Sequence, residues 1–202
     1  MVAFENEYDG VYRLKIPFEN LYTSVFLILA DDPILVDCAT TAEDVDSWIV
    51  PALAAMGYRL SEIKTVVLTH SHGDHAGGFS RVLALAPEIR VIREEICSLC
   101  DGFFTYPLAG HTKDSIGVLD EKHRTLLSGD GLQGAGVDKY RCSVKLPQEY
   151  LKTMERIKND DRIEHILFSH AYEPWYADRI DGRERVLACL DECPKYIKNK
   201  IT

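Results

Sequence analysis

The chain has 202 residues with a formal net charge of −9 at pH 7; 46% of the residues are hydrophobic and 27% are charged. This composition predicts one globular domain over residues 1–202, and the acidic excess argues against a nucleic-acid partner, whose phosphates attract clustered Lys and Arg. No run of about 18 apolar residues and no secretory signal pattern is present. We therefore expect a cytoplasmic protein with no membrane partner.

The first third of the chain predicts a sheet followed by a helix. Three apolar, β-branched segments are expected to form antiparallel strands, at residues 8–15, 22–30 and 34–38. Residues 41–56 carry apolar side chains at helical spacing, and Gly57 is expected to end that helix. Pro51 lies inside the pattern and predicts a kink or two shorter helices.

The rest of the chain alternates short strands with amphipathic helices, which predicts an α/β protein. Further strands are expected at residues 64–69, 89–92, 115–119, 125–128 and 166–168. Further helices are expected at residues 77–85, 94–100, 147–158 and 183–190.

A dense group of metal-binding residue types follows the strand at 64–69. Four of them, His70, His72, Asp74 and His75, lie within six positions, although the whole chain has only seven histidines. Neutral imidazole and ionised carboxylate suit zinc, manganese or iron, and a catalytic zinc usually keeps one position open for water. The run therefore offers more ligands than one open metal site needs.

Three later segments place further ligand types just beyond an apolar stretch. They are Gly110-His111-Thr112, Ser128-Gly129-Asp130 and Ser169-His170-Ala171. Pairs such as Gly-Asp and Ser-His are common in turns, so one segment alone is a weak signal of a metal site. The shared position after an apolar stretch makes the three together a strong one. The two other histidines, His123 in a turn and His165 after a charged run, are interpreted as structural or solvated.

The run from His70 to His75 resembles the HxHxDH motif of the metallo-β-lactamase superfamily, and the three later segments resemble that family's remaining ligand segments. The resemblance implies a four-layer αββα sandwich, with two mixed sheets and helices on both outer faces. It also implies two divalent transition-metal ions, zinc first and iron or manganese otherwise. The implied ligands are His70, His72 and His111 for the first metal, Asp74, His75 and His170 for the second, and Asp130 for both.

The resemblance further implies hydrolysis of a small ester, thioester or lactone by a metal-bound hydroxide, as in glyoxalase II or a lactonase. Asp74 and Asp130 are the expected catalytic carboxylates, and Tyr106, Tyr140 and Tyr172 are candidate proton donors. The expected partner is a small-molecule substrate. The alternatives are a phosphodiesterase, a mononuclear iron enzyme resembling persulfide dioxygenases, and a binding protein without activity.

The six cysteines suggest a second, weaker hypothesis. Cys97 and Cys100 form a CxxC motif, and Cys189 and Cys193 share a helical spacing, as in some redox pairs or zinc sites. No second pair at zinc-ribbon spacing accompanies them, and Cys38 and Cys142 are interpreted as core or near-site residues. In the cytosol all six are expected to be reduced.

Overall fold

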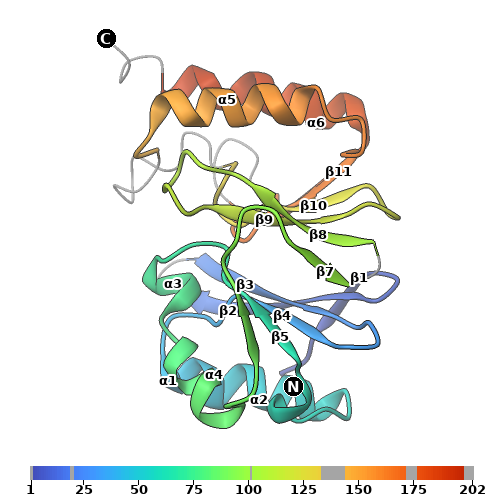
Figure 1. Ribbon diagram of the computed structural model, residues 1–202, viewed down its shortest axis with the longest axis vertical. Helices are drawn as coiled ribbons and strands as arrows, with labels where there is room; N and C mark the ends of the chain where they lie inside the picture. The colour runs from blue at the N-terminus through green and yellow to red at the C-terminus, as the bar shows by residue number, and fades with distance from the viewer. Residues whose placement is uncertain (1, 19–20, 101, 133–143, 172–176, 198–202) are drawn as a thin grey trace. The chain divides into compact units, whose positions relative to one another are not determined.

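The computed structural model describes residues 2–18, 21–100, 102–132, 144–171 and 177–197. The chain divides into two compact units, an N-terminal unit of Met1–Arg93 and a C-terminal unit of Glu94–Thr202. Each unit contains one mixed six-stranded sheet, which confirms the two predicted mixed sheets (Figure 1). The single domain predicted from chain length stays a prediction.

The sheet of the N-terminal unit has the strand order β1-β2-β3-β4-β5-β6. Its strands are β1 Glu5–Tyr8, β2 Val11–Phe18, β3 Leu21–Ile28, β4 Ile34–Val36, β5 Thr65–Val67 and β6 Arg90–Ile92. The three predicted strands, β2, β3 and β4, pair antiparallel, and β1, which was not predicted as a separate strand, pairs antiparallel with β2. The strands β4, β5 and β6 pair parallel. The parallel register aligns Val36 of β4 with Val67 of β5. The residues that follow these two strands therefore leave the sheet at the same edge.

The predicted helix at 41–56 forms with a wide turn at its middle. It consists of α1 Ala42–Asp44, a π-helical turn Val45–Ile49 and α2 Val50–Ala55. Thr41 caps the start through a capping box with Asp44. The wide turn ends just before Pro51, which has no N–H to continue the α-helical pattern. Gly57, at φ +85°, ends the helix as predicted.

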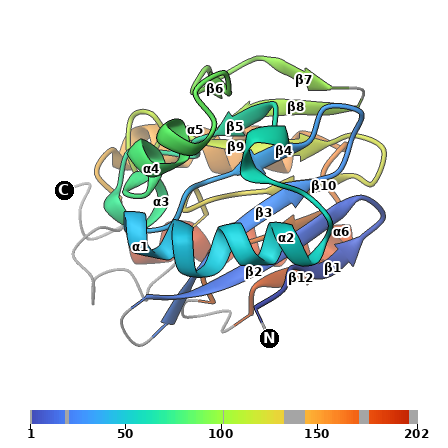
Figure 2. The ribbon, with the colours of Figure 1, turned by 90° about the horizontal axis from the view of Figure 1, so that it is seen from below.

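Helices cover one face of this sheet. The other helices of the unit are a 3-10 turn at Leu60–Glu62, α3 Gly73–Ala76 and α4 Phe79–Leu85. Leu27, Leu35 and Val66 of the sheet share a buried core with Leu53 of α2 and Val82 of α4. Figure 1 shows α1, α2 and α4 on the same side of the strands, and Figure 2 shows α1 and α2 running across them.

The sheet of the C-terminal unit has the strand order β12-β11-β10-β9-β8-β7. Its strands are β7 Ser98–Cys100, β8 Phe103–Pro107, β9 Ile116–Asp120, β10 Thr125–Leu127, β11 His165–Leu167 and β12 Arg179–Asp181. Two of the predicted strands, β9 and β10, pair antiparallel as a hairpin, and β10 pairs parallel with β11. The helices α5 Pro147–Lys158 and α6 Arg183–Glu192 pack on one face, where Met154 and Leu190 share a core with Leu126 and Ile166.

One expectation for this unit is wrong, and one strand was missed. The helix predicted at 94–100 is replaced by the edge strand β7, and β12 was not predicted. Thr105 of β8 pairs with Cys97 through its backbone N–H, at 2.9 Å, and through its hydroxyl, which accepts from the Cys97 N–H at 2.7 Å. Pairing with a neighbouring strand therefore overrides the weak helical pattern of this segment. Of the helices in the described part of the chain, none has the length and apolar character needed to cross a bilayer.

Candidate metal centre

The ligand run of the N-terminal unit begins at the end of β5 and continues into α3. His70 and His75 are buried, with 2% and 0% of their surface exposed, while His72 and Asp74 are partly exposed. The His70 ring lies 4.7 Å from the His72 ring and 4.3 Å from the His75 ring, centre to centre. His75 Nε2 lies 3.4 Å from Asp74 Oδ2. The predicted ligands of this run are therefore one cluster.

Asp37, a residue that the sequence analysis did not select, orients this cluster. Its Oδ1 accepts the Thr69 backbone N–H at 2.8 Å, and its Oδ2 accepts the Thr69 hydroxyl at 2.8 Å. His75 Nδ1 lies 2.7 Å from the same Oδ2 and must donate to it, because an ionised carboxylate only accepts. His75 is thereby fixed in the tautomer that presents Nε2 as the ligand atom.

The position of Asp37 after a strand was the signal that could have identified it. Asp37 directly follows β4, as the ligand run follows β5, and the two strands are parallel neighbours. The expected strand ran on to residue 38 and concealed this position. Asp37 is at φ +66°, a left-handed conformation that Asp tolerates better than most residues.

A pair of glycines brings the ligand run close to the chain after Asp37. The Cys38 N–H donates to His75 O at 2.7 Å, and the Gly78 N–H donates to Ala39 O at 3.1 Å. A Cβ on Gly77 would lie 1.9 Å from Thr40 O, and one on Gly78 would lie 2.1 Å from Cys38 O. Both the backbone and the ring of His75 are therefore held by the segment that follows β4.

In the C-terminal unit, one carboxylate lies between two imidazoles. Asp130 Oδ2 is 3.6 Å from His111 Nε2, and Asp130 Oδ1 is 3.3 Å from His170 Nε2. All three residues are buried, with at most 4% of their surface exposed. Because each oxygen of Asp130 faces a different histidine, the arrangement suits a carboxylate shared by two metal ions.

The parallel strands β10 and β11 bring Asp130 and His170 together. Leu127 and Leu167 are register partners at the ends of these strands, so the residues that follow emerge at one edge of the sheet. The Ser128 N–H donates to Leu167 O at 2.9 Å and continues the pairing. A tight turn then carries the chain to Asp130, with Gly129 at φ +50°.

The donor sets of the two units match the chemistry of a divalent transition metal. Within the N-terminal unit the ligand atoms of His70 and His72, and those of Asp74 and His75, lie within 4.8 Å of each other. Within the C-terminal unit Asp130 has the same proximity to both His111 and His170. Imidazole nitrogens with carboxylate oxygens are the ligands of catalytic zinc and of non-haem iron.

The two other histidines have structural partners in the C-terminal unit. His123 Nδ1 lies 2.7 Å from the buried Asp120, and His165 Nδ1 lies 2.9 Å from Asp181. Among the residues that the structure describes, neither histidine belongs to a group of potential metal ligands. Their interpretation as structural residues agrees with these contacts.

The candidate proton donors are less favourable. The Tyr106 hydroxyl donates to Asp160 Oδ2 at 3.2 Å, and burial, together with the charge of Asp160, raises the pKa of Tyr106 to about 12. The Tyr106 proton is therefore engaged by Asp160, and the raised pKa makes it difficult to release. Tyr140 and Tyr172 lie outside the described residues.

The cysteines form no disulfide among the described residues. Cys100 lies in the edge strand β7 and Cys97 directly precedes that strand. Cys38, Cys189 and Cys193 are buried, and burial raises the pKa of the Cys38 thiol. Cys142 lies outside the described residues. The CxxC motif therefore lies at an edge strand, without a disulfide between its two cysteines.

Comparison with known protein sequences identifies related hydrolases. A family model described as the metallo-beta-lactamase superfamily matches residues 19–98. A hydroxyacylglutathione hydrolase from Stenotrophomonas maltophilia is 29% identical over 149 residues, covering 66% of this chain and 54% of that protein. A probable metallo-hydrolase from Bacillus subtilis, YqjP, is 37% identical over 65 residues, covering 32% of this chain and 20% of that protein. The matches thus span about half, or less, of these relatives' length.

Solved structures share the fold over almost the whole chain. The metallo-β-lactamase FIM-1 from Pseudomonas aeruginosa has a TM-score of 0.74 at 16% identity, covering 98% of this chain and 96% of its own. A rubredoxin oxygen:oxidoreductase from Desulfovibrio gigas has a TM-score of 0.72 at 15% identity, covering 96% of this chain and 61% of its own. At these identities the likeness is one of fold.

Proposed function

This chain has the metallo-β-lactamase fold and matches that superfamily in sequence over residues 19–98, and from this premise we propose that it is a metal-dependent hydrolase. The family resemblance expected from the motifs is thereby confirmed. The observation that carries the proposal is Asp130, whose two carboxylate oxygens each face a different buried histidine. Such a carboxylate is suited to hold two cations at a fixed separation.

In this proposal the ligands of the two units combine into two metal sites. As the family resemblance implies, the first site would have the donors His70, His72, His111 and Asp130, and the second Asp74, His75, Asp130 and His170. Three imidazoles with one carboxylate favour zinc or iron at the first site, and the additional carboxylate Asp74 gives the second site a harder character. Two divalent transition-metal ions, with zinc first, are the expected cofactors.

The chain's own residues supply the rest of the chemistry. Divalent ions bound by these residues would supply a hydroxide nucleophile near neutral pH and would polarise the scissile carbonyl. Asp130 lowers the repulsion between two cations, and Asp74, the more exposed carboxylate of the set, is placed to orient or accept the proton of the attacking water. Asp37 and Thr69 keep His70 and His75 in the tautomer that presents Nε2 as the ligand atom.

For the substrate we propose a small ester, thioester or lactone. The support for a thioester is the relative from S. maltophilia, whose name describes hydrolysis of a hydroxyacylglutathione, although the match covers only 54% of that protein. The net charge of −9 supports a small molecule over a nucleic acid. We further propose that the protein acts in the cytoplasm without a membrane partner.

The test combines metal content with a substrate panel. We expect close to two transition-metal ions per chain, together with hydrolysis of one class among thioesters, lactones and phosphodiesters measured side by side. Asp130→Ala should lose metal and activity while keeping its circular dichroism spectrum, because it removes the anion between two cations. Asp181→Ala, which removes a carboxylate bound to His165 in the same unit, is the matched control and should retain both. Full activity of Asp130→Ala would contradict the bridging role.

One alternative has a specific observation in its favour. The rubredoxin oxygen:oxidoreductase shares this fold at a TM-score of 0.72, so the fold also carries oxygen chemistry. A mononuclear iron enzyme resembling persulfide dioxygenases is therefore the second candidate. A single bound iron with oxygen consumption on a persulfide, in place of two metals with hydrolysis, would select it.

A further inference from the structure

We propose that helix α5 positions the metal ligand His111, with Thr153 as the positioning residue at the centre of that contact. The inference rests on the proposed metal site, because His111 acts as a ligand only if a metal binds there. The positioning contact lies within the C-terminal unit.

The segment that leads from β8 to His111 is held by its carbonyl groups. Four of them accept hydrogen bonds from α5 and the residues just before it. The bonds are Arg156 Nη2 to Pro107 O at 2.7 Å, Thr153 Oγ1 to Ala109 O at 2.7 Å, Leu146 N to Gly110 O at 2.9 Å and Lys145 N to His111 O at 3.2 Å. The carbonyls from Pro107 to His111 are therefore held by α5 and the two residues before it, while the Leu108 N–H donates to Ser115 O at 2.9 Å on the other side of the segment.

Thr153 is the buried centre of this contact, with 1% of its surface exposed. Its hydroxyl donates its single proton to Ala109 O and accepts a hydrogen bond from Arg156 Nη2 at 3.0 Å. The same guanidinium group donates to Pro107 O and lies over the Tyr106 ring. One hydroxyl thus links a cation on α5 to the carbonyl two residues before His111.

Direct contact between backbones sets the distance between α5 and the ligand segment. A Cβ on Gly110 would lie 2.7 Å from both Cα and Cβ of Tyr150, and Gly110 is at φ +150°. Only glycine allows this approach at the residue that precedes the ligand. Tyr150, Met154 and Ile157 in turn fix α5 in the core of the C-terminal unit. The position of His111 is therefore set by contact with a well-packed helix, and a precise metal site requires such rigid support.

The experiment is a cobalt(II) titration of metal-free full-length protein, followed by visible absorption, with thermal unfolding measured in parallel. Thr153→Val keeps the shape of the side chain but removes the hydroxyl, and we expect it to weaken one of two cobalt-binding steps by about tenfold. The step that involves Asp74, His75 and His170 should change much less. Thr153→Ser keeps the hydroxyl and should restore the affinity of the unsubstituted protein.

Thr105→Val separates positioning from stability. Thr105 is also buried, with 4% of its surface exposed, and its hydroxyl accepts the Cys97 backbone N–H at 2.7 Å. Among the described residues, the hydrogen bonds of this hydroxyl go to Cys97 and not to the segment from Pro107 to His111. The Thr105→Val substitution should lower the unfolding temperature without changing the affinity of either cobalt-binding step. If Thr153→Val does not fold, Arg156→Met, which removes the bonds to Pro107 and Thr153 at an exposed position, should weaken the same step less strongly.

Unchanged cobalt affinity in Thr153→Val, or an equal loss in Thr105→Val, would overturn the positioning role while leaving the hydrolase proposal intact. Failure of the unsubstituted protein to bind cobalt at all would overturn both.

Discussion

Asp37 determines the state of two histidine rings, that of His75 directly and that of His70 through the Thr69 hydroxyl. The single proton of this hydroxyl goes to Asp37 Oδ2, so its oxygen can only accept from His70 Nδ1, which lies 3.2 Å away. Asp37 Oδ2 also accepts from His75 Nδ1 at 2.7 Å. Both rings therefore donate through Nδ1 and present Nε2 as the ligand atom. One buried carboxylate, through one hydroxyl, prepares two ligands before any metal binds.

Tyr106 gives a prediction with a definite pH dependence. Its pKa is raised from 10.0 to about 12, chiefly by burial, so folding favours the protonated phenol. This contribution is complete below pH ~10, the pKa of the unfolded chain, and is lost as the pH rises toward the folded value. Tyr106→Phe should cost about 1 kcal/mol near neutral pH through the lost bond to Asp160, and hydrolysis should be retained.

The measurement is the urea midpoint of both proteins between pH 8 and about 11. The stability advantage of the unsubstituted protein should shrink as the pH rises, because the phenyl ring of the Tyr106→Phe variant has no group to ionise. A difference in urea midpoint between the two proteins that stays constant across this pH range would contradict the raised pKa of Tyr106. A large loss of turnover in Tyr106→Phe would restore Tyr106 as a proton donor.

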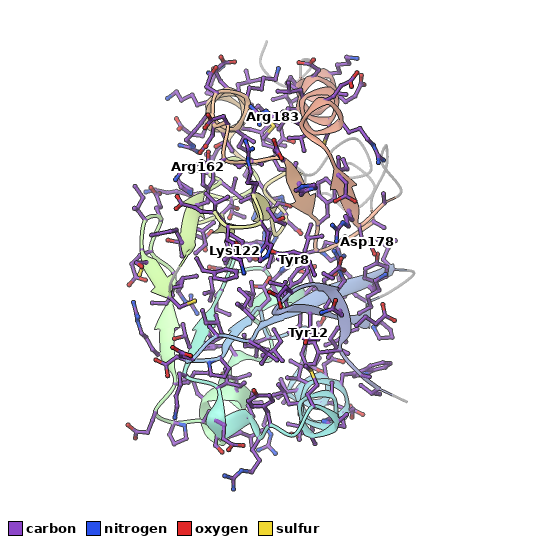
Figure 3. The ribbon with its side chains drawn as sticks, turned by 90° about the vertical axis from the view of Figure 1, so that its right-hand side faces the viewer. Tyr8, Tyr12, Lys122, Arg162, Asp178 and Arg183 are labelled. Carbon is purple, nitrogen blue, oxygen red and sulfur yellow. The ribbon has the colours of Figure 1, made fainter. Side chains whose placement is uncertain are left out.

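At the scale of elements, the C-terminal end of α5 depends on a residue from α6. Arg183, labelled in Figure 3, begins α6, and its guanidinium group donates to the carbonyls of Ile157, Lys158 and Ile163 at 2.6 to 3.3 Å. Ile157 and Lys158 are the last residues of α5, at the negative end of its dipole, and Ile157 O also accepts the Asp160 N–H at 3.3 Å. One cation therefore satisfies the end of one helix and joins it to the start of the next.

Arg183→Met should lower the free energy of unfolding by about 1 to 3 kcal/mol, because three carbonyls lose a charged donor. Arg185→Met is the matched control, since Arg185 is exposed on the same helix, and it should stay within about 0.5 kcal/mol of the unsubstituted protein. Urea unfolding at one pH measures both. Equal effects of the two substitutions would show that charge alone, and not the capping contact, matters.

At the scale of the whole molecule, the proposed ligands come from both compact units, four from residues 70–75 and three from residues 111–170. Metal binding in the proposed arrangement should therefore link the stability of one unit to that of the other. Saturating zinc should raise the unfolding temperature, with a gain of about 4 kcal/mol at a thousandfold excess over the dissociation constant.

Calorimetry with and without a chelator tests this expectation. The metal-loaded protein should unfold in one transition, and metal removal should lower that transition or divide it in two. His72→Ala, in the N-terminal unit, should reduce the zinc effect on both units. Zinc stabilisation confined to one unit would contradict ligand sharing.

Most of the ligand set could be predicted from the sequence because it lies in short local motifs. His70 to His75 share a single run, and His111, Asp130 and His170 each follow an apolar stretch. Asp37 escaped prediction because its role is to receive hydrogen bonds from residues 69 and 75, which are distant in sequence. The segment at 94–100 was wrongly expected to be a helix, because a three-residue edge strand is decided by its neighbour and not by its own pattern.

The sequence by itself determined the α/β class and the residue types available to a metal, since apolar periodicity and ligand motifs are local, and the resemblance of those motifs to a known family implied the two mixed sheets. Only the tertiary structure decided that Asp130 faces two histidines, that Asp37 and Thr69 set the ring tautomers and that α5 holds the segment of His111. These arrangements depend on strand pairing and helix packing, which bring together groups that are tens of residues apart. The composition of the site is local, whereas its geometry is a property of the packed chain.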